Sequence, residues 1–124
     1  MGQGLKIRSY KDLVVWQKGM ELVSRIYLIT KRFPAAEQFG LTSQIQRAAV
    51  SIPANIAEGY GRNTKNEYAN FLRIARGSLT ELETLLLIAR QQSYCSESDF
   101  TALEVTLKEL GAMLYRLRER IVSS

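Results

Sequence analysis

Apolar residues recur along most of this chain at alternating spacings of three and four, which is the period of an amphipathic helix. Three such runs extend from Leu13 to Tyr27, from Ile45 to Tyr60 and from Tyr68 to Ala89. No segment shows the convincing alternation of apolar and polar residues that is typical of a strand. The pattern therefore predicts an all-α fold. The clearest run, near the C-terminus, consists of Phe100, Leu103, Leu107, Leu110, Leu114, Leu117 and Ile121.

Residues that commonly cap helices mark the ends of these runs. The segment "TKNE" has the form of a capping box, with Thr64 as the cap and Glu67 reaching back. The segments "SESD" and "SYKD", which begin at Ser96 and Ser9, follow the same logic with Asp in the last position. Phe33 precedes a proline, so its backbone disfavours the α region and closes the first helix. The predicted helices span about 11–33, 41–61, 65–93 and 97–122.

Short connections between four long helices favour an up-down-up-down four-helix bundle. We expect a single bundle domain over residues 11–122, preceded by a short N-terminal arm over residues 1–10. The first helix carries a second apolar set beside its first, and the third helix is apolar almost all round at 85–89. Such helices are buried on two sides, either by subunit contacts or by a thick core. The two sets of the first helix are Leu13, Trp16, Met20, Val23 and Tyr27, and then Val15, Leu22, Ile26 and Ile29.

The segment "SIPANIAEGYGR", residues 51–62, places a proline inside the second predicted helix. Pro53 has no N–H, so the carbonyl of Ala49 loses its helical partner at a cost of about 3 kcal/mol. The apolar pattern keeps its phase across Pro53, which favours one helix that is kinked near this residue. A break with Ser51 as a new N-cap is the alternative, because proline is tolerated in a first turn.

The same helix carries a polar stripe opposite its apolar one. On a solitary bundle this stripe is simply the solvent-exposed face. If the helix is buried on both sides, each polar group needs a partner, and Arg73 or Arg76 of the third helix could pair with Glu58. The stripe consists of Arg47, Ser51, Asn55, Glu58 and Arg62.

The chain has few of the residues that enzymes use for catalysis. The chain has no histidine, which removes the commonest general base and metal ligand. Cys95 is the only cysteine and has no base beside it in the sequence, and Ser51 has no lysine at a helical spacing. Gly59 and Gly61 form a lone G-x-G with no preceding strand. We therefore expect no enzyme activity, cofactor, metal or small-molecule substrate.

No apolar run approaches the length of about 20 residues that spans a bilayer. The N-terminus "MGQGLKIRS" has no hydrophobic segment of the kind found in secretory signals. The lone cysteine gives no sign of an oxidising compartment. We therefore expect no membrane contact and a cytoplasmic location.

The net charge is +5, and arginines outnumber lysines eleven to six, which favours binding of phosphate or carboxylate groups. In an up-down-up-down bundle, three segments meet at one end: residues 1–12, 58–67 and 116–124. Together they hold +4 of the total +5. Arginines in a last helical turn also complement the helix dipole, which is the simpler explanation for any one of them. The candidate nucleic-acid-binding residues are Lys6, Arg8, Lys11, Arg62, Lys65, Arg116, Arg118 and Arg120.

Three segments, "YKDLVVWQKG", "LTSQIQRAAVSIPANIAEGYGR" and "FLRIARGSLTELETLLLIA", closely resemble the bacterial four-helix-bundle proteins encoded in intervening sequences of 23S rRNA genes. The resemblance covers essentially the whole bundle and implies a homopentameric ring or barrel. It also implies a weaker likeness to accessory proteins of diversity-generating retroelements, which are basic pentamers that bind nucleic acid and a reverse transcriptase. The family's motif carries no assigned chemistry, so it supports a structural role for Ser51, Pro53, Asn55, Glu58 and Gly59, with Arg73 as a possible partner.

These observations predict a non-enzymatic, oligomeric four-helix bundle that binds RNA or DNA through its basic end. Binding should depend on charge and shape, because no base-reading motif is visible. The alternative is a protein-interaction scaffold, whose apolar helix faces recruit a partner such as a reverse transcriptase or another nucleic-acid enzyme.

Overall fold

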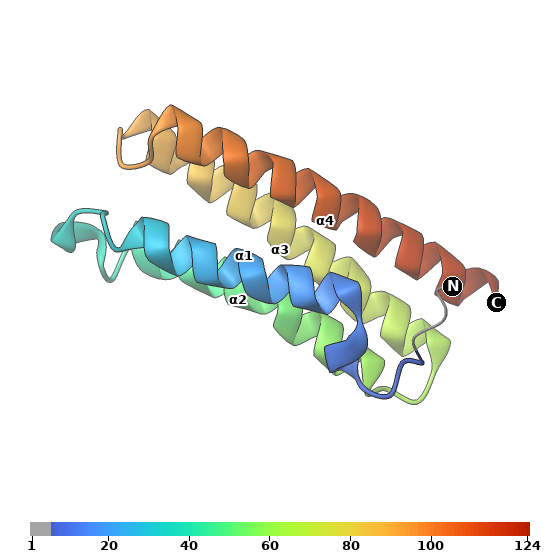
Figure 1. The fold of residues 1–124 in the computed structure, drawn as a ribbon. Coiled ribbons are helices and arrows are strands. Elements are labelled where there is room, and N and C mark those ends of the chain that lie inside the picture. Colours follow the sequence, from blue (N-terminus) through green and yellow to red (C-terminus); the bar gives the residue numbers. More distant parts are fainter. Residues whose placement is uncertain (1–5) are drawn as a thin grey trace.

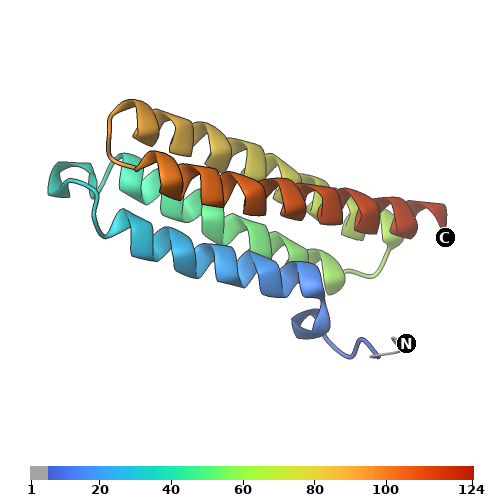
Figure 2. The same ribbon diagram turned by 45° about the horizontal axis from the view of Figure 1, so that its top comes forward.

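The computed structural model describes residues 6–124, and it is a bundle of four antiparallel helices in up-down-up-down order (Figure 1). The all-α fold class predicted from the sequence is confirmed, and no strand occurs in residues 6–124. Figure 2 shows that each long helix reverses the direction of the one before it. The elements are η1 (Tyr10–Asp12), α1 (Val14–Thr30), η2 (Ala35–Glu37), α2 (Leu41–Tyr60), α3 (Lys65–Gln91) and α4 (Glu97–Ser123).

The start of the first helix differs from the prediction. Ser9 does form a capping box: its Oγ accepts from the backbone N–H of Lys11 at 3.1 Å, and the carboxylate of Asp12 accepts from the N–H of Ser9 at 3.2 Å. This box closes only the 3₁₀ turn η1, because the backbone of Leu13 is extended, with φ −73° and ψ 124°. The long helix therefore starts at Val14 instead of residue 11. It ends at Thr30, three residues before Phe33.

The other predicted caps are confirmed. The N–H of Glu67 donates to Thr64 Oγ1 at 3.1 Å, and the N–H of Asp99 donates to Ser96 Oγ at 3.1 Å. Helix α3 ends two residues before the predicted position, because Ser93 takes a left-handed backbone with φ 64°. The N–H of Tyr94 then donates to the carbonyl of Ala89 at 2.9 Å, which closes a Schellman motif.

The core is built from one apolar stripe of each helix. In α2, α3 and α4 the middle of each predicted stripe is buried, whereas its members nearest the basic end are only partly buried: Tyr60, Tyr68, Phe71, Leu117 and Ile121. In α1 the second of the two apolar sets, Val15, Leu22, Ile26 and Ile29, is the buried one. In the first set, Met20 and Tyr27 are 43% and 42% exposed, and the other members are partly buried.

Gly19 lies where α1 packs against α2. A Cβ at Gly19 would lie 3.4 Å from Cβ of Pro53, which is close to ordinary van der Waals contact, so the two helices approach each other closely here. Pro53 is itself buried inside a helix that continues from Leu41 to Tyr60. The continuous helix rules out the alternative of a break at Ser51, while the kink near Pro53 stays a prediction.

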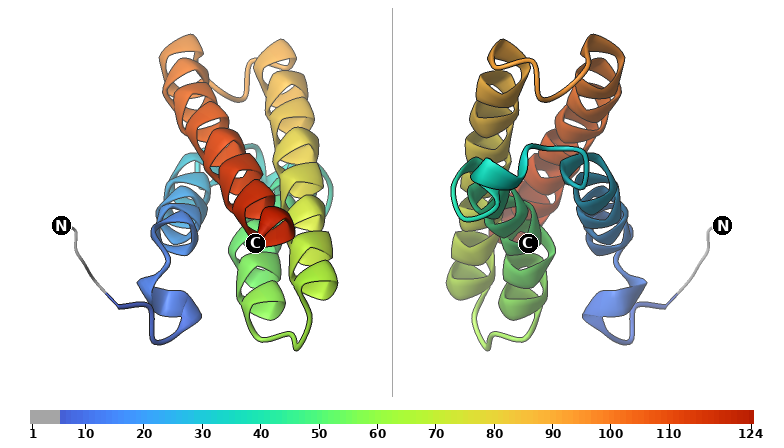
Figure 3. Two further views of the ribbon diagram at one scale, coloured as in Figure 1. Left: turned by 90° about the vertical axis from the view of Figure 1, so that its right-hand side faces the viewer. Right: turned by 90° about the vertical axis from the view of Figure 1, so that its left-hand side faces the viewer.

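The four helices are not equally close to one another. Figure 3, which looks along the bundle, shows α1 beside α2, α2 beside α3 and α3 beside α4. The interface between α1 and α4 is the least extensive of the contacts between neighbouring long helices. This open side of the bundle shapes the site described next.

Candidate nucleic-acid interface

Three segments far apart in the sequence meet at one end of the bundle, as the topology predicted. The start of α1, the turn between α2 and α3 and the end of α4 lie together at the right of Figure 1. A direct contact joins two of them, because Lys65 Nζ donates to the backbone carbonyl of Ser124. We call this the basic end; its candidate residues are Lys6, Arg8, Lys11, Arg62, Lys65, Arg116, Arg118 and Arg120.

The arm before α1 presents exposed cations. Three of them are exposed: Lys6, Arg8 and Lys11. The one carboxylate of this segment, Asp12, does not neutralise them directly: it accepts from the backbone N–H of Arg8 at 2.8 Å and from that of Ser9. The backbone of Arg8 and Ser9 is therefore bonded to Asp12, while Lys6, Arg8 and Lys11 remain exposed.

The three arginines at the end of α4 differ in what surrounds them. Arg116 and Arg120 are exposed and have no ion pair within residues 6–124. Arg118 is half-buried, lies 3.6 Å from the carboxylate of Glu119 and has a buried Nε without a hydrogen-bond partner among the described residues. Arg116 and Arg120 are thus the two free arginines at the end of α4, whereas Arg118 already contacts Glu119.

Arg120 of α4 also affects the pKa of Tyr68 in α3. Burial and the nearby Tyr60 raise the pKa of Tyr68, and the positive charge of Arg120 opposes this rise. The two rings of Tyr60 and Tyr68 meet edge to face, with centroids 6.1 Å apart. Aromatic side chains therefore fill the end of the bundle between α2 and α3, beneath the cations.

Arg62, in the turn between α2 and α3, is engaged within the protein. Its guanidinium lies 3.2 Å from the carboxylate of Glu58 and 4.9 Å from the centroid of the Phe71 ring. An exposed pair of this kind is worth about 0–1 kcal/mol, so a phosphate could compete for Arg62. Sequence spacing alone could not separate these engaged cations from the free ones.

A groove opens beside the free arginines, and no sequence pattern predicted it. It lies between the start of α1 and the end of α4, with a volume of about 740 Å³. Leu13, Met113 and Leu117 are only partly buried in it, although Leu13 and Leu117 belong to predicted core stripes. The groove forms because α1 and α4 contact each other less than the other neighbouring helices do. Its lining includes Ile7, Leu13, Val14, Val15, Met113, Leu117, Arg116 and Arg120.

The motif in α2 has a different role, because its polar residues bond to one another and to α3. Ser51 Oγ and Ser78 Oγ lie 2.8 Å apart. The side-chain amide of Asn55 donates to the carbonyl of Ser51 at 2.8 Å and to its Oγ at 2.9 Å. The Ser51–Ser78 hydrogen bond therefore joins α2 to α3, and Asn55 supports it from within α2.

Two further motif residues permit close helix contacts. Pro53 packs against Gly19 of α1, as described above. At Gly59 a Cβ would lie 2.8 Å from Cβ of Phe71, closer than real Cβ atoms approach. Glu58 pairs with Arg62, so neither Arg73 nor Arg76 serves it; Arg73 donates to Asn70 Oδ1 at 2.7 Å instead.

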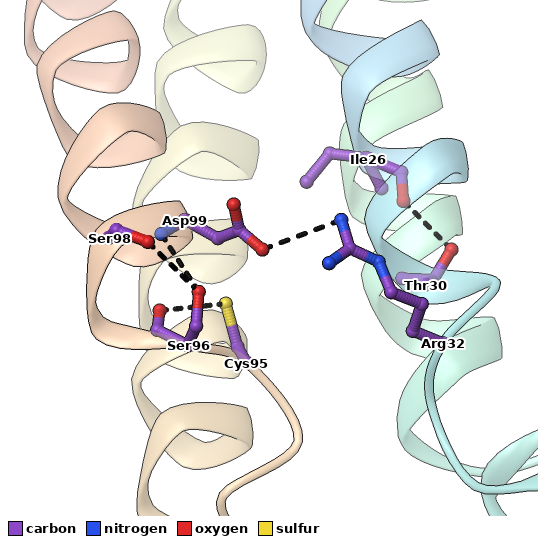
Figure 4. Close-up of polar contacts among 7 residues, drawn as sticks. All are labelled: Ile26, Thr30, Arg32, Cys95, Ser96, Ser98 and Asp99. Atoms are coloured by element: carbon purple, nitrogen blue, oxygen red, sulfur yellow. Dashed lines mark hydrogen bonds and ion pairs between the residues drawn. The ribbon is translucent and has the colours of Figure 1, made fainter.

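The lone cysteine lies at the opposite end of the bundle, where Figure 4 shows its surroundings. Cys95 is buried, and its thiol contacts the carbonyl of Ser96 at 3.7 Å. Burial raises the pKa of this thiol, and Asp99 adds to the rise against the opposing charges of Arg32 and Arg90. A neutral, covered thiol is a poor nucleophile.

Within residues 6–124, no group of three or more His, Cys, Asp or Glu side chains is arranged to hold a metal ion. None of the helices in the same part of the chain combines the length and the hydropathy needed to cross a membrane.

A family model described as 23S rRNA-intervening sequence protein matches residues 11–116. The chain belongs to this family. Its fold also resembles a crystal structure from Bacteroides thetaiotaomicron, described as a protein of unknown function from the S23 ribosomal protein family. The two chains are 25% identical, with a TM-score of 0.78, over 85% of this chain and 98% of the other. No curated protein matches this chain.

Proposed function

We propose that this member of the 23S rRNA-intervening sequence protein family is a non-enzymatic protein that binds RNA or DNA through its basic end. The observation that supports this most directly is the exposure of Arg116 and Arg120 without ionic partners in the described part of the chain. Lys6, Arg8 and Lys11 add exposed charge on the neighbouring arm. The cytoplasm, where ribosomal RNA is found, is the location that this role requires.

Phosphate contacts would supply most of the affinity. Each cation that replaces condensed counterions on a nucleic acid makes binding weaker as salt rises, and the slope counts the contacts. A single chain offers few such contacts. In the homo-oligomer implied by the family resemblance, every copy would add its basic end, and several weak contacts would combine into stable binding.

The test is a titration of the protein with a labelled structured RNA between about 50 and 200 mM salt. We expect the logarithm of the affinity to fall linearly with the logarithm of the salt concentration. The double variant Arg116→Glu/Arg120→Glu should lower the affinity at least about tenfold and reduce the slope. Arg118 is left unchanged, because it is half-buried and its reversal could disturb the fold.

A control of equal charge separates the basic end from the net charge of the protein. Lys31→Glu/Lys108→Glu reverses two exposed cations away from the basic end, one just after α1 and one in the middle of α4. This variant should keep most of the affinity. Equal losses in both double variants would show that only net charge matters, and the absence of binding at low salt would reject the proposal.

The scaffold alternative rests on exposed apolar side chains along the helices. Tyr27 and Leu28 of α1 are 42% and 60% exposed, and Leu87 and Ile88 of α3 are also exposed. A protein partner that packs on them would bind with little dependence on salt. A pull-down that recovers only nucleic acid, released by nuclease, would count against this alternative.

A further inference from the structure

We propose that the groove between α1 and α4 takes an unpaired nucleotide, with the base on its apolar floor and the phosphate on Arg116 and Arg120. This inference rests on the proposed function and narrows it to single-stranded or looped nucleic acid. Binding by charge alone would not require the apolar floor of this groove, so the floor is the feature that the inference explains.

The floor of the groove is apolar and incompletely covered by the protein. Val15 is buried beneath it, whereas Leu13, Met113 and Leu117 are half-buried, so their side chains remain accessible from the groove. Its volume of about 740 Å³ lies within the range of about 300–1,000 Å³ that is usual for small-ligand pockets. An apolar floor of this size suits the flat face of a base, which gains from leaving water.

Two cations in the groove are available to an anionic ligand. Arg116 and Arg120 line it one helical turn apart, so their side chains lie on the same face of α4. Two carboxylates also line it, but Asp12 accepts two backbone N–H groups and Glu119 pairs with Arg118, whereas the two arginines have no ion pair within residues 6–124. A ligand with an apolar face and an adjacent anion therefore complements this site.

An unpaired nucleotide meets both conditions, and two other occupants meet them less well. The bases of a duplex are stacked and paired, so only its phosphates could reach the site and the apolar floor would stay unused. An acidic amphipathic helix would match the groove, but it would leave unexplained the cations that continue beyond it. Lys6 and Arg8 lie on the arm next to Ile7, which itself lines the groove, and they extend the positive charge as a polyanion requires.

The experiment compares two RNAs on the same protein: an oligouridylate of about 12 nucleotides and a blunt duplex of the same length. Met113→Gln and Leu117→Gln make the floor polar without changing the charge. We expect each variant to weaken oligouridylate binding about tenfold and duplex binding less than twofold. The matched control is Leu87→Gln/Ile88→Gln, which changes exposed apolar residues of α3 outside the groove and should affect neither RNA.

A second measurement uses the unaltered protein and so does not depend on how well the variants fold. An oligouridylate that carries photoreactive thiouridine should crosslink to residues 7–15 or 113–120, as mapped by mass spectrometry. Crosslinks confined to other segments would overturn the inference.

The remaining outcomes separate this inference from the proposed function. If the floor variants fold normally and bind both RNAs as the unaltered protein does, the basic end binds nucleic acid but the groove does not, and the inference is wrong. If they keep RNA affinity and lose binding of an acidic amphipathic peptide, the groove is a protein site and the inference is again wrong. Failure of the unaltered protein to bind either RNA rejects both proposals.

Discussion

Two glycines in neighbouring helices show how the role of one residue type depends on its surroundings. Gly59 of α2 faces α3, and a Cβ there would lie 2.8 Å from Cβ of Phe71 and 3.2 Å from the carbonyl oxygen of Tyr68. We expect Gly59→Ala to lower the free energy of unfolding by about 1–2 kcal/mol, because overpacking outweighs the gain in helix propensity. Urea denaturation followed by circular dichroism measures this change.

Gly77, in the middle of α3, is the matched control. It is exposed, and a Cβ there would have no atom within 4 Å. The same substitution at this position should raise the free energy of unfolding by about 0.5–1 kcal/mol, since only the helix propensity changes. Equal effects at the two glycines would contradict the tight contact between α2 and α3.

The buried thiol predicts a dependence of stability on pH. Burial raises the pKa of Cys95 above its ordinary value of 9.0, so the unfolded chain releases this proton at a lower pH than the folded chain does. The contribution is fully present below about pH 9 and is lost as the pH rises toward the folded pKa. The free energy of unfolding should therefore decline above about pH 9, and Cys95→Ala should flatten this decline. A curve that is unchanged by the substitution would contradict the shift.

Among the helix pairs, the seam between α1 and α4 is held differently from the rest. Three basic residues seven positions apart, two in α1 and one just after it, each contact a polar group of α4. Lys18 lies 3.5 Å from Glu109, Arg25 donates to Thr106 at 2.7 Å, and Arg32 lies 3.5 Å from Asp99. These contacts are largely solvent-exposed, and such pairs contribute little because water competes for both charges. The seam orders the two helices without binding them tightly.

This difference leads to a prediction for single truncations on either side of the seam. Lys18→Ala and Arg32→Ala should each change the free energy of unfolding by less than about 1 kcal/mol. Leu110→Ala, a fully buried residue of α4, should cost about 2–5 kcal/mol. Chemical denaturation of the three variants checks this. A large loss at Lys18 or Arg32 would mean that the polar contacts, and not the core, hold α4 in place.

The spacing of apolar residues located the core of α2, α3 and α4, but in α1 it left two candidate faces. Both apolar sets of α1 have helical spacing, so periodicity could not decide between them. The choice depends on tertiary contacts, such as the close approach of Gly19 to Pro53 of α2. The prediction that the long helix starts at residue 11, after the cap at Ser9, was wrong for a related reason. A capping box of four residues fits a single turn as well as a long helix.

The candidate site was predictable only in part. Helix order sufficed to bring the three basic segments to one end, since it requires no knowledge of side chains. The division into free Arg116 and Arg120, half-buried Arg118 and paired Arg62 depends on contacts between segments. The groove could not be predicted, because it results from the limited contact between α1 and α4, which no local sequence pattern encodes.

The two ends of the whole molecule differ in how far their charges are satisfied. At the end opposite to the basic end, Arg90 lies 3.2 Å from Glu97 and over the ring of Phe100, and Arg32 contacts Asp99. At the basic end, Arg116 and Arg120 have no such partners within the described residues. This asymmetry favours an anionic partner at the basic end, and side-by-side copies in parallel would bring several basic ends together.

An apolar face along α1 and α2 is where such side-by-side packing would occur. Met20 and Tyr27 of α1 and Val50 of α2 are each more than 40% exposed, and Tyr27 and Val50 line the same shallow groove. If the family resemblance holds for assembly, light scattering should give about 70 kDa, the mass of five 14.1 kDa chains. Met20→Glu should shift the mass toward one chain, because a charge on an apolar interface is costly to bury. Thr101→Glu, at an exposed position of α4, should not. A monomeric mass for the unaltered protein would contradict the ring, and RNA binding would then rest on the few cations of a single basic end.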